Sequence, residues 1–487
     1  MRFNIPKASA LVVPTAVNVA GGTAFQHTSK VEYATALLTA LCSDTYYKTG
    51  DQSANRIAEL TKTIEDPLFA AKSALYTRHK GFLRTVSHVV AGELAQRVKG
   101  EKWTRKFFDK VVFRVDDVTE ILSYFTGKYG RKKIPNALKD GLCNALVRFD
   151  AYQLAKYRAD GKDMNLWDAV NICHPKATEA LSALMKGTLV AAETWETKVS
   201  GAGKVEGDTT AKAEAKKEAW TDLLTKKKLG YFAALRNLRN IAKDAPEAMG
   251  LALAFLVDPK QVAKSKVLPF QFQTALDAVK GLVQAPVVHA LNAAMGISVA
   301  NVPKFPGKTL IAVDCSGSMD GKPIQIATLL AAVLYKSQDQ ADILQFANNA
   351  QPITGLNPGD TIDSISKTIL RQRVNGGTNF HSIFHAIGVK RYDRIIILSD
   401  MQSWMNPDGY YNASPVHVQD SFKAYCKDIG STPYLYSFNL NSVDGTLQFP
   451  EPKIFCLAGF SDAILGVMGQ LEQDPQALIH EIESMEI

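Results

Sequence analysis

The sequence predicts a helical-repeat region followed by a doubly wound α/β domain, and three observations support this fold class. Apolar residues recur at helical spacing from residue 51 to about residue 300, in segments of about ten to fifteen residues separated by short loops. From residue 310 onward, buried-strand patterns alternate with helical ones, which is typical of a parallel sheet. The chain has 487 residues, 46% of them hydrophobic, and is long enough for two such domains. We divide it into residues 1–300 and 301–487.

The helical region is expected to form an α-solenoid, in which each helix pair buries its apolar face against its neighbours. No strict sequence repeat is present. We expect Val115, Asp116 and Asp117 to cap a helix that begins at Val118, and residues 199–229 to start as an exposed polar loop. The expected helices include Lys30–Leu41, Val118–Gly127, Asn136–Phe149, Tyr152–Tyr157, Tyr231–Ile241, Glu247–Phe255, Gln273–Val283 and Ala285–Ala294.

The second region alternates short apolar strands with helices, which indicates a sheet covered on both faces. The expected strands are Leu310–Val313, Ala341–Phe346, Arg394–Ser399, Leu435–Phe438 and Ile454–Leu457. The expected helices are Pro323–Ser337, Thr361–Leu370, Ser382–Ile387, Val418–Lys427 and Phe460–Leu471.

Oxygen-bearing side chains follow two of these strands and one glycine-rich turn. Asp314, Ser316 and Ser318 come directly after the first strand, Thr378 lies in the turn Asn-Gly-Gly-Thr-Asn, and Asp400 ends a later strand. Hard oxygen ligands suit Mg²⁺, which keeps some positions open or filled by water. Because serine and aspartate are common in turns, Asp-x-Ser-x-Ser alone would be weak; the three segments together predict a divalent metal site. The alternative is a vestigial site that holds only water.

Charge is distributed unevenly along the chain. Residues 1–300 carry 43 Lys and Arg against 29 Asp and Glu, whereas residues 301–487 carry 13 against 19. Residues 72–158 alone carry 19 basic and 8 acidic residues. Such a concentration of positive charge indicates a polyanionic partner such as nucleic acid. The alternative is a solvated basic face with no partner.

Other features indicate the cellular compartment of the protein and whether it is an enzyme. The six cysteines are scattered without Cys-x-x-Cys spacing, which favours free thiols in a reducing cytoplasm. No apolar run is long enough for a transmembrane helix, and the first residues do not read as a secretory signal. The phosphate-binding pattern GxxxxGK[ST] is absent, and no nucleophile and base pair accompanies the metal pattern, so we expect a protein that is not an enzyme.

These motifs together resemble the Ro/TROVE family, and Asp-x-Ser-x-Ser with its threonine and second aspartate is similar to the metal-ion-dependent adhesion site of von Willebrand factor A domains. The resemblance covers nearly the whole chain. Its motifs are GGTAF at 21–25, SDTYY at 43–47, the block at 131–158, NICHPKA at 171–177, YFAALRNLRNI at 231–241, LPFQF at 268–272, DCSGSM, GGTNF and LSDM.

The resemblance implies a ring of HEAT-like helical repeats closed by a von Willebrand factor A domain. It further implies binding of small noncoding Y RNAs on a basic surface and of the single-stranded 3′ ends of misfolded RNA, in RNA quality control or decay. Bacterial members of the family are similar to components of assemblies that include an exoribonuclease. For this chain we expect a cytoplasmic protein, monomeric, with bound Mg²⁺.

Carried over to matching positions, the resemblance points to Lys156, Arg158 and His174 as RNA-binding residues. The loop cluster Arg131, Lys132 and Lys133 suits phosphate contacts, although a solvated loop is the plain alternative. His174 is equally well read as the end of a helix. Arg236 and Arg239 are shared family features that could instead brace helices, and tyrosines beside basic residues (Tyr124, Tyr129, Tyr152 and Tyr157) could stack on bases or belong to the core.

Two other functions remain open at this point. The first is a metal-dependent adaptor, in which the α/β domain binds a carboxylate of a partner protein and the helices are a scaffold. The second is a nuclease or phosphoesterase that uses Asp314 and Asp400, although two-metal phosphoryl chemistry usually requires more acidic residues.

Overall fold

The computed structural model describes residues 16–17, 23–26, 29–39, 50–81, 83–157, 161–192, 194–205, 208–401, 417–440, 446–447, 454–458, 465, 468, 472 and 477–487. Among these, no helix has the length and apolar character needed to span a membrane. The motif at 43–47, Arg158 and most of the expected helix Phe460–Leu471 lie outside the described residues.

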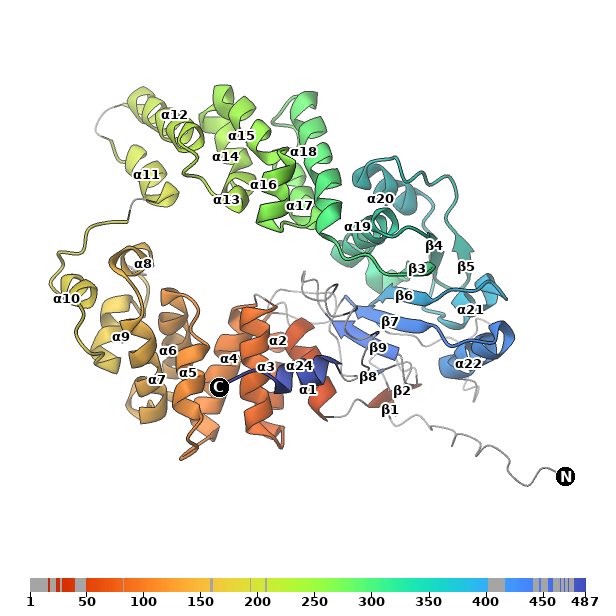
Figure 1. The fold of residues 1–487 in the computed structure, drawn as a ribbon, viewed down its shortest axis with the longest axis horizontal. Helices are drawn as coiled ribbons and strands as arrows, with labels where there is room; N and C mark the ends of the chain where they lie inside the picture. The colour runs from red at the N-terminus through yellow and green to blue at the C-terminus, as the bar shows by residue number, and fades with distance from the viewer. Residues whose placement is uncertain are drawn as a thin grey trace.

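The helical region forms two arcs that follow one another in Figure 1. The first contains α1 (Ser29–Thr39), α2 (Gly50–Thr63), α3 (Pro67–His79), α4 (Thr85–Arg97), α5 (Thr104–Lys110), α6 (Val115–Tyr129), η1 (Arg131–Lys133), α7 (Asn136–Val147), α8 (Ala151–Lys156), α9 (Leu166–Cys173) and α10 (Glu179–Met185). The second contains α11 (Trp195–Ala202), α12 (Thr209–Thr225), α13 (Tyr231–Arg236), α14 (Leu238–Asp244), η2 (Pro246–Ala248), α15 (Met249–Leu256), α16 (Pro259–Ser265), α17 (Pro269–Val279), α18 (Ala285–Ser298) and η3 (Val299–Asn301).

Each helix packs on its near neighbours in the sequence, as a solenoid requires. For example, α4 packs on α2, α3 and α6, and α18 packs on α15, α16 and α17. Local signals explain several helix starts: Asp66 accepts a hydrogen bond from Phe69 N at the start of α3, and Pro67 occupies the first turn.

The α/β part contains a six-stranded sheet in the order β5-β4-β3-β6-β7-β9. All neighbours are parallel except β5 (Ala350–Pro352), which pairs antiparallel with β4 at one edge. The other strands are β3 (Thr309–Asp314), β4 (Ala341–Phe346), β6 (Arg394–Ser399), β7 (Tyr434–Asn439) and β9 (Ile454–Ala458). The helical segments of this part are η4 (Gly317–Met319), α19 (Lys322–Ser337), α20 (Ile362–Arg371), α21 (His381–Ile387) and α22 (Val418–Ile429).

Alternating side chains of β3 enter two different cores, which explains why helices cover both faces of the sheet. Ile311 and Val313 pack in the cluster that includes the buried residues of α19, whereas Leu310 and Ala312 pack with Phe384 and the other aromatic residues of α21 and α22. The strand is therefore apolar from Leu310 to Val313, as parallel strands buried on both sides are. The doubly wound arrangement is confirmed, with β5 as an unpredicted antiparallel edge.

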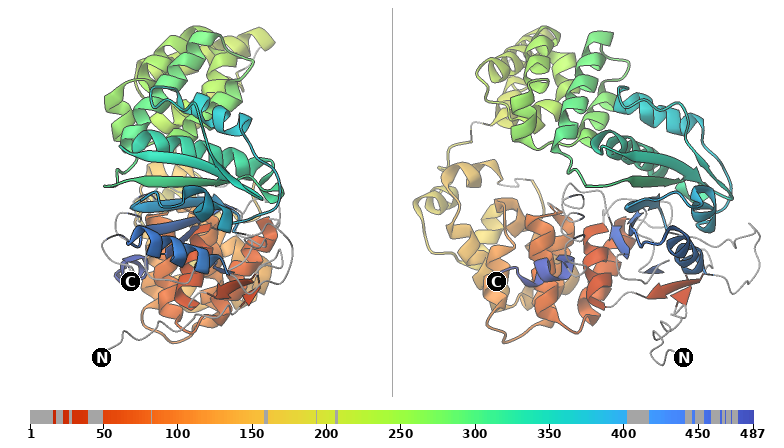
Figure 2. Two further views of the ribbon diagram at one scale, coloured as in Figure 1. Left: turned by 90° about the vertical axis from the view of Figure 1, so that its right-hand side faces the viewer. Right: turned by 45° about the vertical axis from the view of Figure 1, so that its right-hand side comes forward.

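The end of the chain returns to its beginning. Helix α24 (Ala477–Glu483) packs on α1 and α3. At the other end of the helical region, α18 contacts α20 and α17 contacts α19. Lys30 Nζ lies 2.6 Å from Glu483 Oε1, and Tyr76 OH donates to Glu481 Oε2 at 3.1 Å. The helical arcs and the α/β part thus complete a ring, which Figure 1 and the right-hand view of Figure 2 show.

A small antiparallel sheet also joins the two ends of the sequence. Strand β2 (Thr23–Gln26) pairs with β1 (Ala16–Val17) on one side and with β8 (Thr446–Leu447) on the other. The pairing of β2 with the late strand β8 was not predicted from the sequence.

Three expectations about local structure were wrong. Val115, Asp116 and Asp117 lie inside α6; its cap residue is Arg114, whose backbone N–H donates to the Asp117 carboxylate at 2.8 Å. Helix α11 extends to Ala202, so the segment from residue 199 does not begin as a loop. The expected helix Tyr231–Ile241 is divided at Asn237 into α13 and α14.

Candidate metal centre and basic surface

Asp314 and Asp400 meet because their strands are neighbours. Strands β3 and β6 are parallel, and Val313 pairs with Leu398, so both strands end at the same edge of the sheet. Both carboxylates are fully buried. Burial, followed by the nearby charge of Asp400, raises the pKa of Asp314 well above its ordinary range.

Two hydrogen bonds orient the Asp314 carboxylate. The backbone N–H of Ser316 donates to Oδ1 at 2.9 Å, and the hydroxyl of Ser399 donates to Oδ2 at 2.5 Å. Ser316 is buried and Ser318 half-buried, and their hydroxyl oxygens lie 3.3 Å apart. The first three predicted ligands therefore form one cluster at the end of β3.

The threonine loop is attached to this cluster through the backbone. Gly317 N donates to Gly376 O at 3.2 Å, which joins the loop after β3 to the glycine-rich turn. Asn348, in the loop after β4, accepts from Gly377 N at 2.6 Å through Oδ1 and accepts from Asn379 Nδ2 at 2.9 Å through its backbone oxygen. Thr378 between them is buried. The structure thus gathers all five predicted ligand positions at one edge of the sheet.

This donor set fits a hard divalent cation. Two buried carboxylates repel each other, and a dication between them would neutralise both charges, while serine and threonine hydroxyls supply further oxygen ligands. No three His, Cys, Asp or Glu side chains gather at a possible metal position in the described part of the chain, so the hydroxyls are essential to this site.

The residues that support these loops were not predicted from the sequence. The hydroxyl of Ser399 fixes Asp314, and the buried side chain of Gln345 accepts from Val374 N at 3.0 Å. Arg373 Nη2 donates to the backbone oxygens of Cys315 and Ser316 at 3.1 and 3.3 Å, and its guanidinium also contacts Asp320. The only sequence signal for the contact between Ser399 and Asp314 is that Ser399 ends a predicted strand directly before Asp400.

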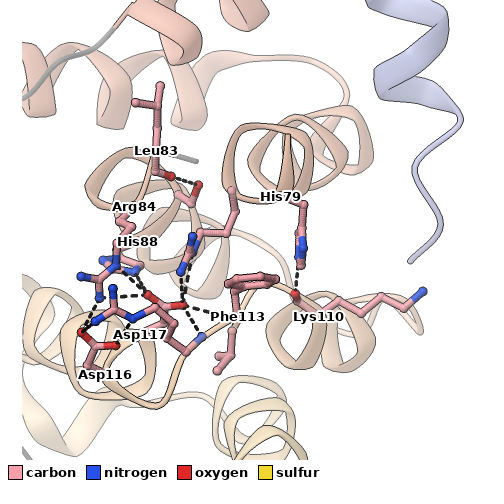
Figure 3. A network of polar contacts seen from close by, with 12 residues as sticks. His79, Leu83, Arg84, His88, Lys110, Phe113, Asp116 and Asp117 are labelled. Atoms are coloured by element: carbon pink, nitrogen blue, oxygen red, sulfur yellow. Dashed lines mark hydrogen bonds and ion pairs between the residues drawn. The ribbon is translucent and has the colours of Figure 1, made fainter. Parts of the chain in front are cut away.

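The basic helical region contains a buried polar network around Asp117 (Figure 3). Its carboxylate accepts from Arg78 Nη2 at 2.8 Å, from Arg84 Nη2 at 3.1 Å and from His88 Nε2 at 2.9 Å. It also accepts from the backbone of Phe113 at 3.0 Å. Burial alone would raise the pKa of Asp117, but the hydrogen bond with His88 and the charge of Arg78 hold it well below its usual range.

The predicted RNA-binding residues Arg131–Lys133 and Lys156 lie near opposite ends of helix α6. Arg131, Lys132 and Lys133 form η1, directly after the C-terminal end of α6, and all three are exposed. Lys156 lies near the N-terminal end of the same helix. The centre of the Tyr157 ring is 5.4 Å from Lys156 Nζ and 4.4 Å from the guanidinium carbon of Arg114, the cap residue of α6. A helix of 15 residues is about 22 Å long, so these two groups are separate.

His174 ends α9 in a left-handed conformation, with φ 52° and ψ 54°. Its side chain is exposed, and its backbone oxygen lies 3.9 Å from Cys143 Sγ of α7. His174 therefore ends a helix, which was one of the two interpretations of its sequence position. Its imidazole is also accessible to a ligand. Arg158 lies outside the described residues.

Two of the four tyrosines singled out in the sequence are half-buried and bound to a buried carboxylate. The hydroxyls of Tyr124 and Tyr129 each donate to the buried carboxylate of Glu93 at 2.6 Å, and Lys128 Nζ lies 2.7 Å from the same group. Tyr152, by contrast, is 49% exposed. The hydroxyls of Tyr124 and Tyr129 therefore connect α6 to α4.

Comparison with known proteins was made on sequence and on fold. A family model described as TROVE domain matches residues 189–305. The chain is 23% identical over 272 residues to the RNA-binding protein RO60 of Deinococcus radiodurans. This alignment spans 49% of the chain and 48% of that relative, or about half the relative's length. The structure is similar to the crystal structure of the Deinococcus radiodurans RO (RSR) protein, with a TM-score of 0.64 and 20% identity, covering 93% and 99% of the two chains. The predicted fold class is confirmed.

Proposed function

Because a TROVE domain model matches residues 189–305 and the fold is similar to that of a Ro protein, we propose that this chain belongs to the Ro/TROVE family and is an RNA-binding protein of ribonucleoprotein particles. The name of its Deinococcus relative, RNA-binding protein RO60, supports this proposal. The observation that carries it is that most acidic residues of segment 72–158 form ion pairs, whereas many of its basic residues are exposed.

Acidic residues of the basic segment 72–158 are mostly engaged with basic partners. Six of the eight form ion pairs: Glu93, Asp109, Asp116, Asp117, Glu120 and Asp140. The exposed basic side chains of the same segment include Lys80, Lys99, Lys102, Lys106, Arg131, Lys132 and Lys133. The surface of this arc is therefore strongly positive, which suits a phosphate backbone.

The RNA that we propose is a structured small RNA of the Y type, together with misfolded RNAs that have a single-stranded 3′ end. Lys156, Arg158, His174 and the Arg131–Lys133 cluster would contact phosphates, and His174 could also stack on an unpaired base. In this proposal the protein acts in RNA quality control or decay in the cytoplasm, as a monomer, alongside an exoribonuclease.

The α/β part would hold Mg²⁺ through Asp314, Ser316, Ser318, Thr378 and Asp400. When bound, the ion supplies a Lewis-acidic position for an oxygen ligand from a partner, such as a carboxylate. The residues of the chain orient that position: Ser399 and Ser316 N fix Asp314, and Asn348 fixes the threonine loop. We propose a binding role, without cleavage of RNA. Cleavage of labelled RNA that requires Mg²⁺ and disappears in Asp314→Ala would contradict it.

Salt dependence of RNA affinity tests the proposed function. We would titrate labelled hairpin RNA with the full chain at several salt concentrations and compare a variant with Arg131, Lys132 and Lys133 changed to Gln. The slope of log affinity against log salt should become shallower by about 0.9 for each phosphate that the variant no longer neutralises. The matched control changes three exposed lysines of the acidic half, Lys367, Lys390 and Lys427, to Gln and should leave the slope unchanged. Equal slopes for all three proteins would contradict the proposal.

A further inference from the structure

Helix α13 exposes an aromatic ring beside a guanidinium. Phe232 is 46% exposed, although phenylalanine is usually buried. Arg236, one helical turn later, is also exposed, and its guanidinium carbon lies 5.6 Å from the centre of the Phe232 ring. The pair is thus preassembled at the surface, where the partly exposed ring is accessible to a ligand.

Helix α14 continues the same exposed face. The buried positions Ala234, Leu238, Ile241 and Ala245 recur at spacings of four, three and four residues, through the break at Asn237. This places one apolar stripe toward the core along both helices. Arg239 and Lys243, which are exposed and one turn apart, therefore lie on the side of α14 that follows on from Phe232 and Arg236.

These three cations are not used to stabilise the fold. Arg236, Arg239 and Lys243 form no ion pair with any carboxylate of the described residues, in contrast to Arg78, Arg84, Arg114 and Arg148 in the first arc. The one acidic residue of α14, Asp244, is half-buried and accepts from Trp220 Nε1 at 3.4 Å. Bracing of neighbouring helices, the alternative left open for Arg236 and Arg239, is therefore not their role in this structure.

We propose that Phe232, Arg236, Arg239 and Lys243, here called the α13–α14 stripe, bind single-stranded RNA. A base stacks on the exposed face of Phe232, and the phosphates of the following nucleotides contact the three cations. The stripe spans about 16 Å, roughly the length of five nucleotides of a stacked strand. Stacking on one ring and charge contacts along one line require an unpaired strand and tolerate any base sequence. This inference rests on the proposed function and assigns part of it to residues in the second helical arc.

Fluorescence anisotropy with labelled twelve-nucleotide oligoadenylate tests the stripe in the full chain. Phe232→Leu keeps an apolar side chain but removes the stacking surface, and should weaken binding about 5- to 150-fold. Phe232→Tyr should bind as the unmodified protein does. Arg236→Gln should reduce the salt slope by about 0.7, as expected for one contact with a single strand. Lys212→Gln, which removes an exposed cation from α12, is the matched control and should change neither quantity.

The outcomes separate the stripe from the proposed function. Unchanged oligoadenylate binding by Phe232→Leu overturns the stacking site, even if Arg236→Gln weakens binding. If the unmodified protein binds a blunt hairpin RNA but every stripe variant binds oligoadenylate normally, the stripe is wrong and the proposed function stands. If the unmodified protein binds neither RNA, the proposed function fails. Displacement of oligoadenylate by an equal charge concentration of polyglutamate would indicate an acidic protein ligand and would also overturn the stripe. Thermal unfolding of each variant confirms that the fold is retained.

Discussion

The hydroxyl of Ser399 donates a hydrogen bond to Oδ2 of Asp314 across the two central strands of the sheet. The direction of this bond follows from a second contact, because the backbone N–H of Met401 donates to Ser399 Oγ at 2.9 Å. The serine oxygen therefore accepts from Met401, and its proton is directed to the carboxylate. Met401 itself has a φ of 63°, a left-handed conformation that is uncommon for a side chain of this size.

We expect Ser399→Ala to weaken Mg²⁺ binding about 10- to 100-fold, as is typical when a group that orients a metal ligand is removed. Isothermal titration calorimetry with MgCl₂ measures this directly. The control is Ser437→Ala on the neighbouring strand β7, because the Ser437 hydroxyl is buried and has no hydrogen-bond partner among the described residues. A loss of affinity in both variants would indicate a general effect on the sheet and would count against the role of Ser399.

Gly376→Ala should disturb the threonine loop without unfolding the sheet. A Cβ at this position would lie 2.4 Å from Asn348 Oδ1, and the φ of 146° disfavours any side chain. Asn348 would have to move, which breaks its bond to Gly377 N. We expect weaker Mg²⁺ binding, with a far-ultraviolet circular dichroism spectrum like that of the unmodified protein. Gly250→Ala in α15, where an added Cβ meets no atom within 4 Å, is the control. Normal Mg²⁺ affinity in Gly376→Ala would show that this loop does not shape the site.

Asp117→Asn should be destabilising by about 3–5 kcal/mol at neutral pH, because it leaves Arg78 buried without its counter-charge. The pKa of Asp117 is lower in the folded than in the unfolded protein, so its stabilisation is present above about pH 4 and is lost as the pH falls toward the folded value. The difference in urea unfolding free energy between the two proteins should therefore shrink below pH 4.

The exposed Asp163 supplies the control for this prediction. Asp163→Asn should unfold at the same urea concentration as the unmodified protein from pH 3 to pH 7. A free-energy difference for Asp117→Asn that stays constant over this range would mean that the charge of Asp117 is not what stabilises the network.

Apolar packing, and not the surface ion pair, should hold α24 against the first arc. Ile482 is 1% exposed, so Ile482→Ala is expected to destabilise the protein by about 2–5 kcal/mol. Lys30 and Glu483 are about a third or more exposed, and their coupling in a double-mutant cycle should be about 0–1 kcal/mol. Thermal and urea unfolding measure both. A coupling energy larger than the effect of Ile482→Ala would contradict this prediction.

Regular elements of the α/β part could be predicted from sequence because their signals are local. The strands Ala341–Phe346 and Arg394–Ser399 were predicted to the residue, since parallel strands buried on both faces are continuous apolar runs. The meeting of Asp314 and Asp400 could be anticipated for the same reason, because the ends of neighbouring parallel strands lie at one edge of a sheet.

Other features could not be predicted because they depend on residues distant in the sequence. Asp117 was expected to be a cap, but it is buried by Arg78, Arg84 and His88, which lie about 30 to 40 residues earlier. The break at Asn237 lies within an uninterrupted helical pattern, and the return of α24 to α3 joins opposite ends of the chain. The support of Asp314 by Ser399 likewise depends on strand order, which no local pattern in the sequence states.

Binding of a hairpin RNA with and without a single-stranded 3′ tail is the decisive measurement for the proposed RNA-binding function. We would measure both affinities over a range of salt concentrations, for the unmodified chain and for the double variant Lys156→Ala/His174→Ala. We expect tighter binding of the tailed RNA, a steep loss of affinity with salt, and weaker binding by the double variant. Equal and weak binding of both RNAs, insensitive to salt and to the two substitutions, would contradict it and would favour a metal-dependent protein adaptor.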